Sequence, residues 1–229
     1  MPARTTTAQL EAQRRLRATL TAGVRRAWAD LPAYDEANVS EWLERVLPLV
    51  AAAQRTSSAL TNAYLARMLG RQPMPVDVAA VTGAAVRAGA QPADVYRRPF
   101  VNVWTALKAG RPYTDAVASG AARAAGTAAI DVQLAARATS AAVQNADPRI
   151  IGYQRVADPD CCDYCRMIDG AFVKRADAMA LHNGCGCGLE PVLRDAPETE
   201  PELPDGVAVE AHGELGPVIV DPSDHFTRL

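Results

Sequence analysis

Aromatic residues are scarce in this sequence of 229 residues, which holds three Trp, six Tyr and three Phe. Much of its 49% hydrophobic fraction is alanine, and alanine buries little surface per residue. We therefore expect a thin hydrophobic core, or a core that a partner completes. The hydrophobic fraction is nevertheless that of a globular protein, and it excludes a chain that is disordered throughout.

Long apolar runs are also absent. The longest candidate, residues 46–53, contains Pro48 and is much shorter than the roughly 18–20 residues that cross a bilayer. The first residues show no apolar signal core behind their charge. The sequence therefore predicts a soluble, unexported protein that works without a membrane.

Few residues are available for common kinds of catalysis. The sequence has no G-x-S-x-G motif and no glycine-rich phosphate loop. Its histidines are His182, which lies among cysteines, and His212 and His225, which lie in an acidic tail. A Ser–His–Asp triad is therefore not expected. A Cys–His protease that pairs His182 with Cys185 or Cys187 stays open as an alternative.

Charge is distributed unevenly along the chain. Residues 1–150 carry 18 Lys and Arg against 11 Asp and Glu, and residues 151–229 carry 6 against 15. The basic first part is compatible with contact to nucleic acid or to an acidic protein, and also with an ordinary solvated helical surface. If nucleic acid is bound, the candidate contacts are Arg14, Arg15, Arg25 and Arg26.

Hydrophobic periodicity predicts a mainly α fold. Leu16, Leu20, Val24 and Trp28 recur at steps of four residues, which places them on one helix face. The expected helices cover residues 6–31, 38–70, 76–88, 100–109 and 114–145. Pro48 should kink or divide the second of these helices. The last is rich in alanine, the best helix former.

The composition changes after Asp147-Pro148. Residues 150–156 are β-branched and aromatic, which predicts a strand, and all five cysteines follow. The expected organisation is a helical region (1–147), a small α+β Cys/His-rich module (148–193), an acidic proline-rich flexible linker (194–206) and a C-terminal tail (207–229). The tail is interpreted either as a docking peptide or as a strand that returns to the body.

The cysteine spacing is typical of a structural zinc site. Cys162 and Cys165 form one C-x-x-C pair, and His182 and Cys185 have the same spacing, so these four are the expected ligands of Zn²⁺. Cys187 is an alternative fourth ligand. Packed thiols, disulfides and a redox pair are the competing interpretations. A catalytic zinc is disfavoured because no other histidine lies in this region.

The same region resembles a known family. The segments that carry the resemblance are Gly152-Tyr-Gln-Arg-Val156, Asp160-Cys-Cys-Asp-Tyr-Cys165, Leu181-His-Asn-Gly-Cys-Gly-Cys187 and the following Pro191. They resemble the C-terminal signature of phage Mu F-like head-morphogenesis proteins, and the variants of actinobacterial phages in particular. The specific match covers residues 151–191.

The resemblance implies a minor capsid protein that acts in procapsid assembly near the portal. The partners it implies are the portal protein, major capsid or scaffold proteins, the packaged DNA, and further copies of the chain. The expected location is inside the virion head, after assembly in the host cytoplasm. Some relatives are described as capsid maturation proteases, which is the first alternative. A zinc-knuckle protein that binds nucleic acid is the second.

Overall fold

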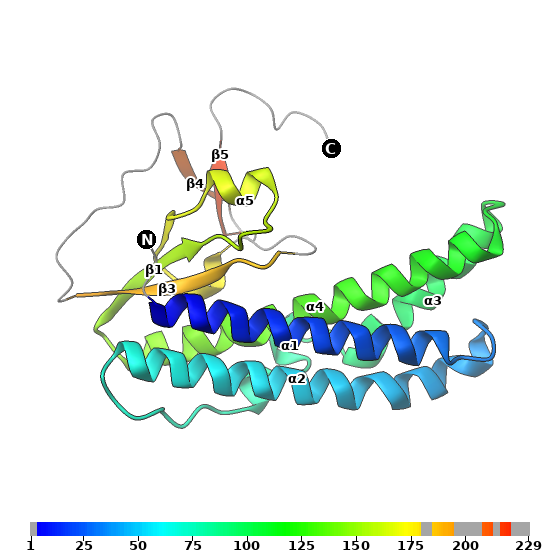
Figure 1. Ribbon diagram of the computed structural model, residues 1–229, viewed down its shortest axis with the longest axis horizontal. Helices are drawn as coiled ribbons and strands as arrows, with labels where there is room; N and C mark the ends of the chain where they lie inside the picture. Colours follow the sequence, from blue (N-terminus) through cyan, green and yellow to red (C-terminus); the bar gives the residue numbers. More distant parts are fainter. Residues whose placement is uncertain (1–3, 180–184, 195–207, 213–215, 221–229) are drawn as a thin grey trace.

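The computed structural model describes residues 4–179, 185–194, 208–212 and 216–220. Long helices form the body of the molecule (Figure 1). They are α1 (Arg4–Ala29), α2 (Val39–Met68), α3 (Pro92–Lys108) and α4 (Tyr113–Ala146). The mainly α fold expected from the sequence is therefore confirmed. None of the helices in the described part of the chain combines the length and apolar character that a bilayer-spanning helix requires.

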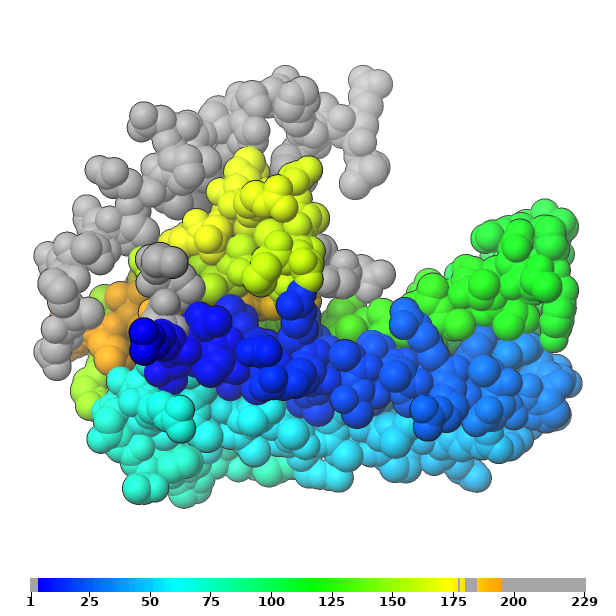
Figure 2. Space-filling view, viewed as in Figure 1, coloured from blue at the N-terminus to red at the C-terminus, as the bar shows by residue number. Residues whose placement is uncertain are grey.

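A small module stands on this helical body, against α1 and near the N-terminus (Figures 1 and 2). Its elements are β1 (Ile150–Val156), α5 (Asp163–Met167), β2 (Phe172–Val173) and β3 (Gly188–Leu193). The strands form an antiparallel sheet in the order β2-β1-β3. The strand expected over residues 150–156 is thus confirmed, and it is the central one.

The core of the helical body is built where few aromatic side chains meet many small ones. Trp28 of α1 packs edge-on against Trp42 of α2 and Phe100 of α3, with ring centroids 5.1 and 5.0 Å apart. Helix α4 contacts α1, α2 and α3, and its buried face is rich in small residues, chiefly alanine. Small side chains on α4 let the other helices approach closely, so a few large rings are enough to fill the interior.

Gly120 marks the closest approach on α4. A Cβ at this position would lie 2.6 Å from a ring carbon of Trp28 and 2.6 Å from a methyl carbon of Val103. We expect Gly120→Ala to lower the free energy of unfolding by about 1–3 kcal/mol through overpacking, although alanine is the better helix former. Urea denaturation would measure this change.

Gly23 of α1 provides the matched control. A Cβ at Gly23 would lie 3.6 Å from a methyl carbon of Leu49, an ordinary van der Waals contact. Gly23→Ala should therefore raise stability by roughly 0.5–1 kcal/mol, the gain in helix propensity. Equal effects of the two substitutions would contradict the close approach at Gly120.

Two helix predictions are wrong. Residues 76–88 form only short 3₁₀ turns, Ala79–Val81 and Ala85–Arg87, because Gly83 and Gly89 adopt positive φ and interrupt the helix. Helix α3 begins at Pro92 instead of residue 100 and continues through Pro99. Of the two outcomes expected at Pro48, a kink or a division, the division does not occur, because α2 continues through this residue.

The sheet is attached to the helices through a second small core. Tyr153 of β1 is fully buried, and its hydroxyl donates to the carbonyl of Ser140 in α4 over 2.8 Å. Tyr64 of α2 and Val143 of α4 belong to the same cluster. The module is therefore anchored to the ends of α2 and α4 that lie farthest from the α3–α4 turn.

The tail is described only in part. Strands β4 (Ala208–His212) and β5 (Gly216–Val220) pair with each other in an antiparallel hairpin. Neither joins the three-stranded sheet among the described residues, so the described part of the tail does not return as a strand of that sheet. The expected linker, residues 194–206, lies outside the described residues apart from Arg194.

Candidate metal centre

Three cysteine thiols of the module lie close together. Cys165 comes from α5, and Cys185 and Cys187 come from the segment that leads into β3. All three are buried, and their Sγ atoms lie within 4.8 Å of one another. Zinc holds thiolate sulfurs at about 2.3 Å in a tetrahedron, which places ligand sulfurs about 3.8 Å apart. The three thiols are therefore close enough together to bind one structural metal ion.

Local sequence explains why these sulfurs converge. Cys162 is the N-cap of α5, and Cys165 occupies the buried position of that short helix. Gly186 separates the other two cysteines and lets the chain pass close to its neighbours, since a Cβ there would lie 2.2 Å from Oδ2 of Asp158. Cys185 and Cys187, on either side of this glycine, both direct their sulfurs to the same centre.

A buried arginine lies against the thiols. Arg155 of β1 is only 2% exposed, and its Nη2 atom lies 3.1 Å from Sγ of Cys165 and 3.4 Å from Sγ of Cys185. Burial alone lowers the pKa of Arg155, but the neighbouring thiols, Cys187 first among them, outweigh burial and raise it above its ordinary value. A buried cation requires nearby negative charge, so this environment favours thiolates.

The pKa values of the three thiols are shifted in different directions. The hydrogen bond between Cys185 and Cys187 lowers the pKa of Cys187 to about 5. The same hydrogen bond, together with burial, raises the pKa of Cys185, and burial raises that of Cys165 to about 11. A metal ion bound by all three sulfurs as thiolates would displace the protons that the thiols carry.

The structure brings together only part of the ligand set expected from the sequence. Cys165 and Cys185 meet, and the alternative ligand Cys187 joins them. Cys162 is exposed and lies outside the three-thiol group. His182 lies outside the described residues.

Sequence reasoning missed Arg155. The available signal is strand alternation, because residues 153 and 155 share one face of β1 and both are buried. An arginine on the inner face of a strand, close to a cysteine cluster, indicates a site that carries negative charge.

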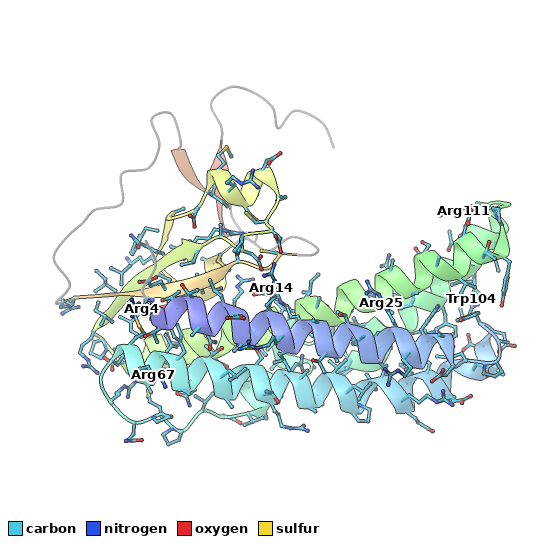
Figure 3. All side chains as sticks on the ribbon, in the orientation of Figure 1. Arg4, Arg14, Arg25, Arg67, Trp104 and Arg111 are labelled. Carbon is cyan, nitrogen blue, oxygen red and sulfur yellow. The ribbon has the colours of Figure 1, made fainter. Side chains whose placement is uncertain are left out.

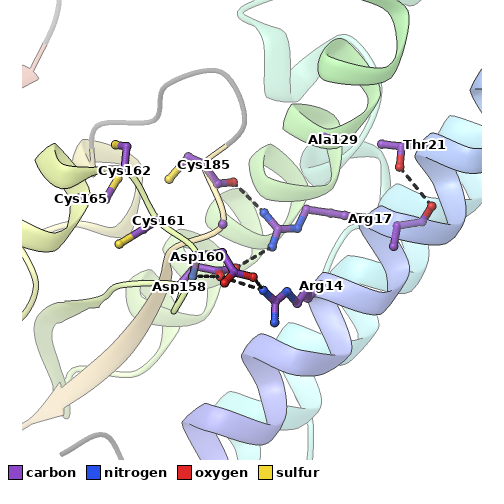
Figure 4. Close-up of a pocket in the computed structure, with 12 residues that line it drawn as sticks. Arg14, Arg17, Thr21, Ala129, Asp158, Asp160, Cys161, Cys162, Cys165 and Cys185 are labelled. Atoms are coloured by element: carbon purple, nitrogen blue, oxygen red, sulfur yellow. Dashed lines mark hydrogen bonds and ion pairs between the residues drawn. The ribbon is translucent and has the colours of Figure 1, made fainter. Parts of the chain in front are cut away.

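Residues of the helical body form an outer layer around the centre. Arg17 of α1 and Gln133 of α4 both donate to the backbone carbonyl of Cys185, over 2.7 and 2.9 Å. Arg14 and Arg17 also form ion pairs with Asp158 (Figure 4). A cleft of about 590 Å³ opens here between α1 and the cysteine module.

Together, the fold and the site define a class of protein: a helical body that carries a small cysteine module able to hold a metal ion. The family model described as VG15 protein matches residues 1–210, so the chain belongs to this phage-associated family. The match includes both the helical body and the cysteine module. No curated protein and no solved structure matches the chain.

Proposed function

We propose that this protein is a phage minor capsid protein of the Mu F-like type that acts in head morphogenesis near the portal. Its membership of a phage-associated family carries the proposal. The Mu F-like signature, residues 151–191, adds support because its described residues form one folded unit: β1, α5, β2 and β3 around the thiol centre. The protein would reside inside the virion head and would assemble there from the host cytoplasm.

Exposed apolar side chains support a protein partner at the opposite end of the body. Leu107 at the end of α3 and Tyr113 at the start of α4 are 37% and 56% exposed. They flank the turn that holds Arg111, at the end of the molecule farthest from the module (Figure 3). Tyrosine is frequent in the residues that dominate binding energy at interfaces. Portal, major capsid or scaffold proteins, or another copy of the chain, are the partners we propose for this end.

A double substitution tests this contact. Leu107→Asp with Tyr113→Asp alters exposed side chains, so we expect the protein to fold while the copies incorporated per phage head fall at least tenfold, a loss of about 1.4 kcal/mol or more in binding. Quantitative immunoblotting of purified procapsids, with portal protein as the reference, would measure this. Val78→Asp, at a side chain that is 44% exposed in the connection between α2 and α3, is the matched control.

A phage that lacks the gene tests the proposal as a whole. We expect its heads to be aberrant or empty and wild-type protein supplied in trans to restore them. Normal, infectious heads without the protein, or absence of the wild-type protein from purified procapsids, would contradict a role in head assembly. Normal incorporation of the double variant would contradict only the contact at the α3–α4 end.

We further propose that the metal is a structural Zn²⁺ held by Cys165, Cys185 and Cys187. Three thiolates, one divalent cation and the Arg155 guanidinium carry a total charge of zero, which favours a neutral fourth ligand in this buried place. A neutral imidazole meets this condition, so His182 stays the proposed fourth ligand.

Of the four arginines expected to contact nucleic acid, two form ion pairs with carboxylates of the chain. Arg14 pairs with Asp158 and Asp160, and Arg15 pairs with Glu11. Arg25 and Arg26 are exposed, and neither has a carboxylate partner among the described residues. We therefore propose that these two would carry any contact with DNA phosphates.

The thiol centre gives no support to the alternative of a capsid maturation protease. Cys187 has the lowered pKa of a nucleophile, but it is only 1% exposed, so a peptide carbonyl has no access to its sulfur. The side chains of all three histidines lie outside the described part of the chain.

A further inference from the structure

Cys185 belongs to the thiol centre and also contacts two helices of the body. Its sulfur belongs to the thiol centre. Its backbone carbonyl accepts hydrogen bonds from Arg17 of α1 and Gln133 of α4, over 2.7 and 2.9 Å. Cys185 therefore links the thiol centre to two helices of the body through hydrogen bonds at its backbone carbonyl.

The contact around this residue is tight, although the cleft of about 590 Å³ opens beside it. The side chain of Arg17 is 12% exposed and Gln133 is buried. Added Cβ atoms at Gly186 and Gly188 would lie 2.2 Å from Asp158 and 2.2 Å from Leu10 of α1. The segment from Cys185 to Gly188 thus has little room to shift while it stays in contact with α1.

We propose that Arg17 and Gln133 are positioning residues for the metal centre, and that metal binding in turn holds the cysteine module against α1 and α4. The proposal rests on the proposed binding of a thiophilic divalent cation. Hydrogen bonds to groups next to metal ligands orient the ligands and commonly change metal affinity 10- to 100-fold. The carbonyl of Cys185 lies on the ligand itself, so Arg17 and Gln133 fix its backbone before the metal arrives.

Linkage makes this coupling reciprocal. If the contact with Arg17 and Gln133 strengthens metal binding by some factor, bound metal strengthens the contact by the same factor. Without the cation, no coordination bond joins Cys185 to Cys165, while the contacts of both sulfurs with Nη2 of Arg155 remain between them. The segment 185–188 then has fewer restraints on its inner side, and the contact with α1 should open more often.

Cobalt titration of the full chain tests the positioning role. Co²⁺ serves as the probe because thiolate ligation to it is visible in absorption spectra, and competition with a chelator gives the affinity. We expect Arg17→Ala and Gln133→Ala each to weaken Co²⁺ binding about tenfold or more without changing its stoichiometry. Arg17→Lys should recover part of the affinity, because lysine retains one donor and the charge.

Arg14→Ala is the matched control. Arg14 comes from the same helix and also pairs with Asp158, but it makes no hydrogen bond to Cys185 among the described contacts. Its substitution should leave Co²⁺ affinity within about twofold of the wild type. Equal losses in Arg14→Ala and Arg17→Ala would assign the effect to the Asp158 ion pairs and overturn the positioning role.

Hydrogen exchange tests the reverse direction. Removal of the metal should raise exchange of the α1 amides near Leu10 and Arg17, while amides of α3 keep their protection.

If the wild-type chain binds no Co²⁺, the proposed metal centre fails. If Co²⁺ binds with unchanged affinity in Arg17→Ala and Gln133→Ala, and α1 exchanges alike with and without it, the metal centre stands and the coupling fails. Circular dichroism of each variant identifies one that does not fold, and Gln133→Ala and Arg17→Lys then decide the result.

Discussion

Replacement of Cys187 by serine should abolish the metal binding that we propose for this protein, whereas replacement of Cys162 by serine should preserve it. Cys187 is buried within 4.8 Å of the two other thiols, and Cys162 is exposed outside their group. A serine hydroxyl keeps the approximate size of the thiol, but it is not an anionic ligand at neutral pH. Elemental analysis of the purified chain should find about one zinc per wild-type or Cys162→Ser chain and almost none in Cys187→Ser.

Thiol titration extends the same experiment. Chelation of the wild type should expose three thiols that the bound ion had protected. Because metal binding to a structural site contributes directly to folding, Cys187→Ser should also lose protection of the cysteine module against proteolysis. Metal loss in Cys162→Ser but not in Cys187→Ser would instead restore the set of Cys162, Cys165, His182 and Cys185. Absence of metal from the wild type, with all five thiols freely titrating, would eliminate the zinc proposal.

His182→Ala addresses the fourth ligand separately. If a neutral imidazole completes the site, its loss should weaken metal binding while the three protected thiols still bind. Unchanged affinity would mean that water or another side chain fills this position.

The difference between Cys162 and Cys187 shows that the spacing of cysteines in the sequence does not by itself predict which of them come together. A C-x-x-C pair at a tight turn commonly points both sulfurs at one ion, but here Cys162 caps α5 while Cys165 lies within it. Cys162 is exposed and Cys165 is buried, although both line the same cleft. In the C-x-C pair, by contrast, Cys185 and Cys187 are both buried and their sulfurs lie within 4.8 Å of each other. Which thiols lie close together thus depends on local backbone conformation, which spacing alone does not reveal.

The helices show the same division between local and tertiary information. Helices α1, α2 and α4 have long apolar stripes or alanine-rich sequence, and residue patterns predicted their existence and ends to within a few residues. The start of α3 could not be predicted, because Pro99 is a local helix breaker. Tertiary packing decides the outcome there: Val95, Tyr96 and Phe100 are all buried against the body, and their burial outweighs the lost hydrogen bond.

Asp131 is a second residue whose role no local pattern revealed. It is one acidic residue in an alanine-rich helix, and yet it is only 1% exposed. Its Oδ1 accepts from Nε of Arg87 over 2.7 Å and from Nε2 of Gln54 over 3.4 Å. Its Oδ2 accepts from the hydroxyl of Tyr96 over 2.6 Å. One carboxylate thereby joins α2, α3, α4 and the 3₁₀ turn that contains Arg87.

Asp131→Ala should lower the free energy of unfolding by about 3–5 kcal/mol, the usual cost of removing one partner from a buried ion pair. The substitution leaves the Arg87 charge and the Tyr96 hydroxyl without their partner in a mostly apolar interior. Asp131→Asn keeps the shape of the side chain and one acceptor oxygen, so we expect a smaller loss. Urea denaturation should show a lower midpoint with an unchanged slope.

Asp115→Ala is the control for charge on the same helix. Asp115 is exposed in the first turn of α4, where an acidic residue contributes only about 0.3–1 kcal/mol through the helix dipole. A change below about 0.5 kcal/mol in Asp131→Ala would contradict a structural role for the network.

The metal content of the Asp131→Asn variant tests whether the two faces of α4 have separate roles. Asp131 points into the helical body, whereas Gln133, two residues further on, contacts Cys185 on the module side. Since residues two apart on a helix do not share a face, the Asn variant should unfold at a lower urea concentration and still bind metal like the wild type. Such a result would mean that α4 supports the body and the metal centre through different residues, so stability and metal affinity can be changed independently.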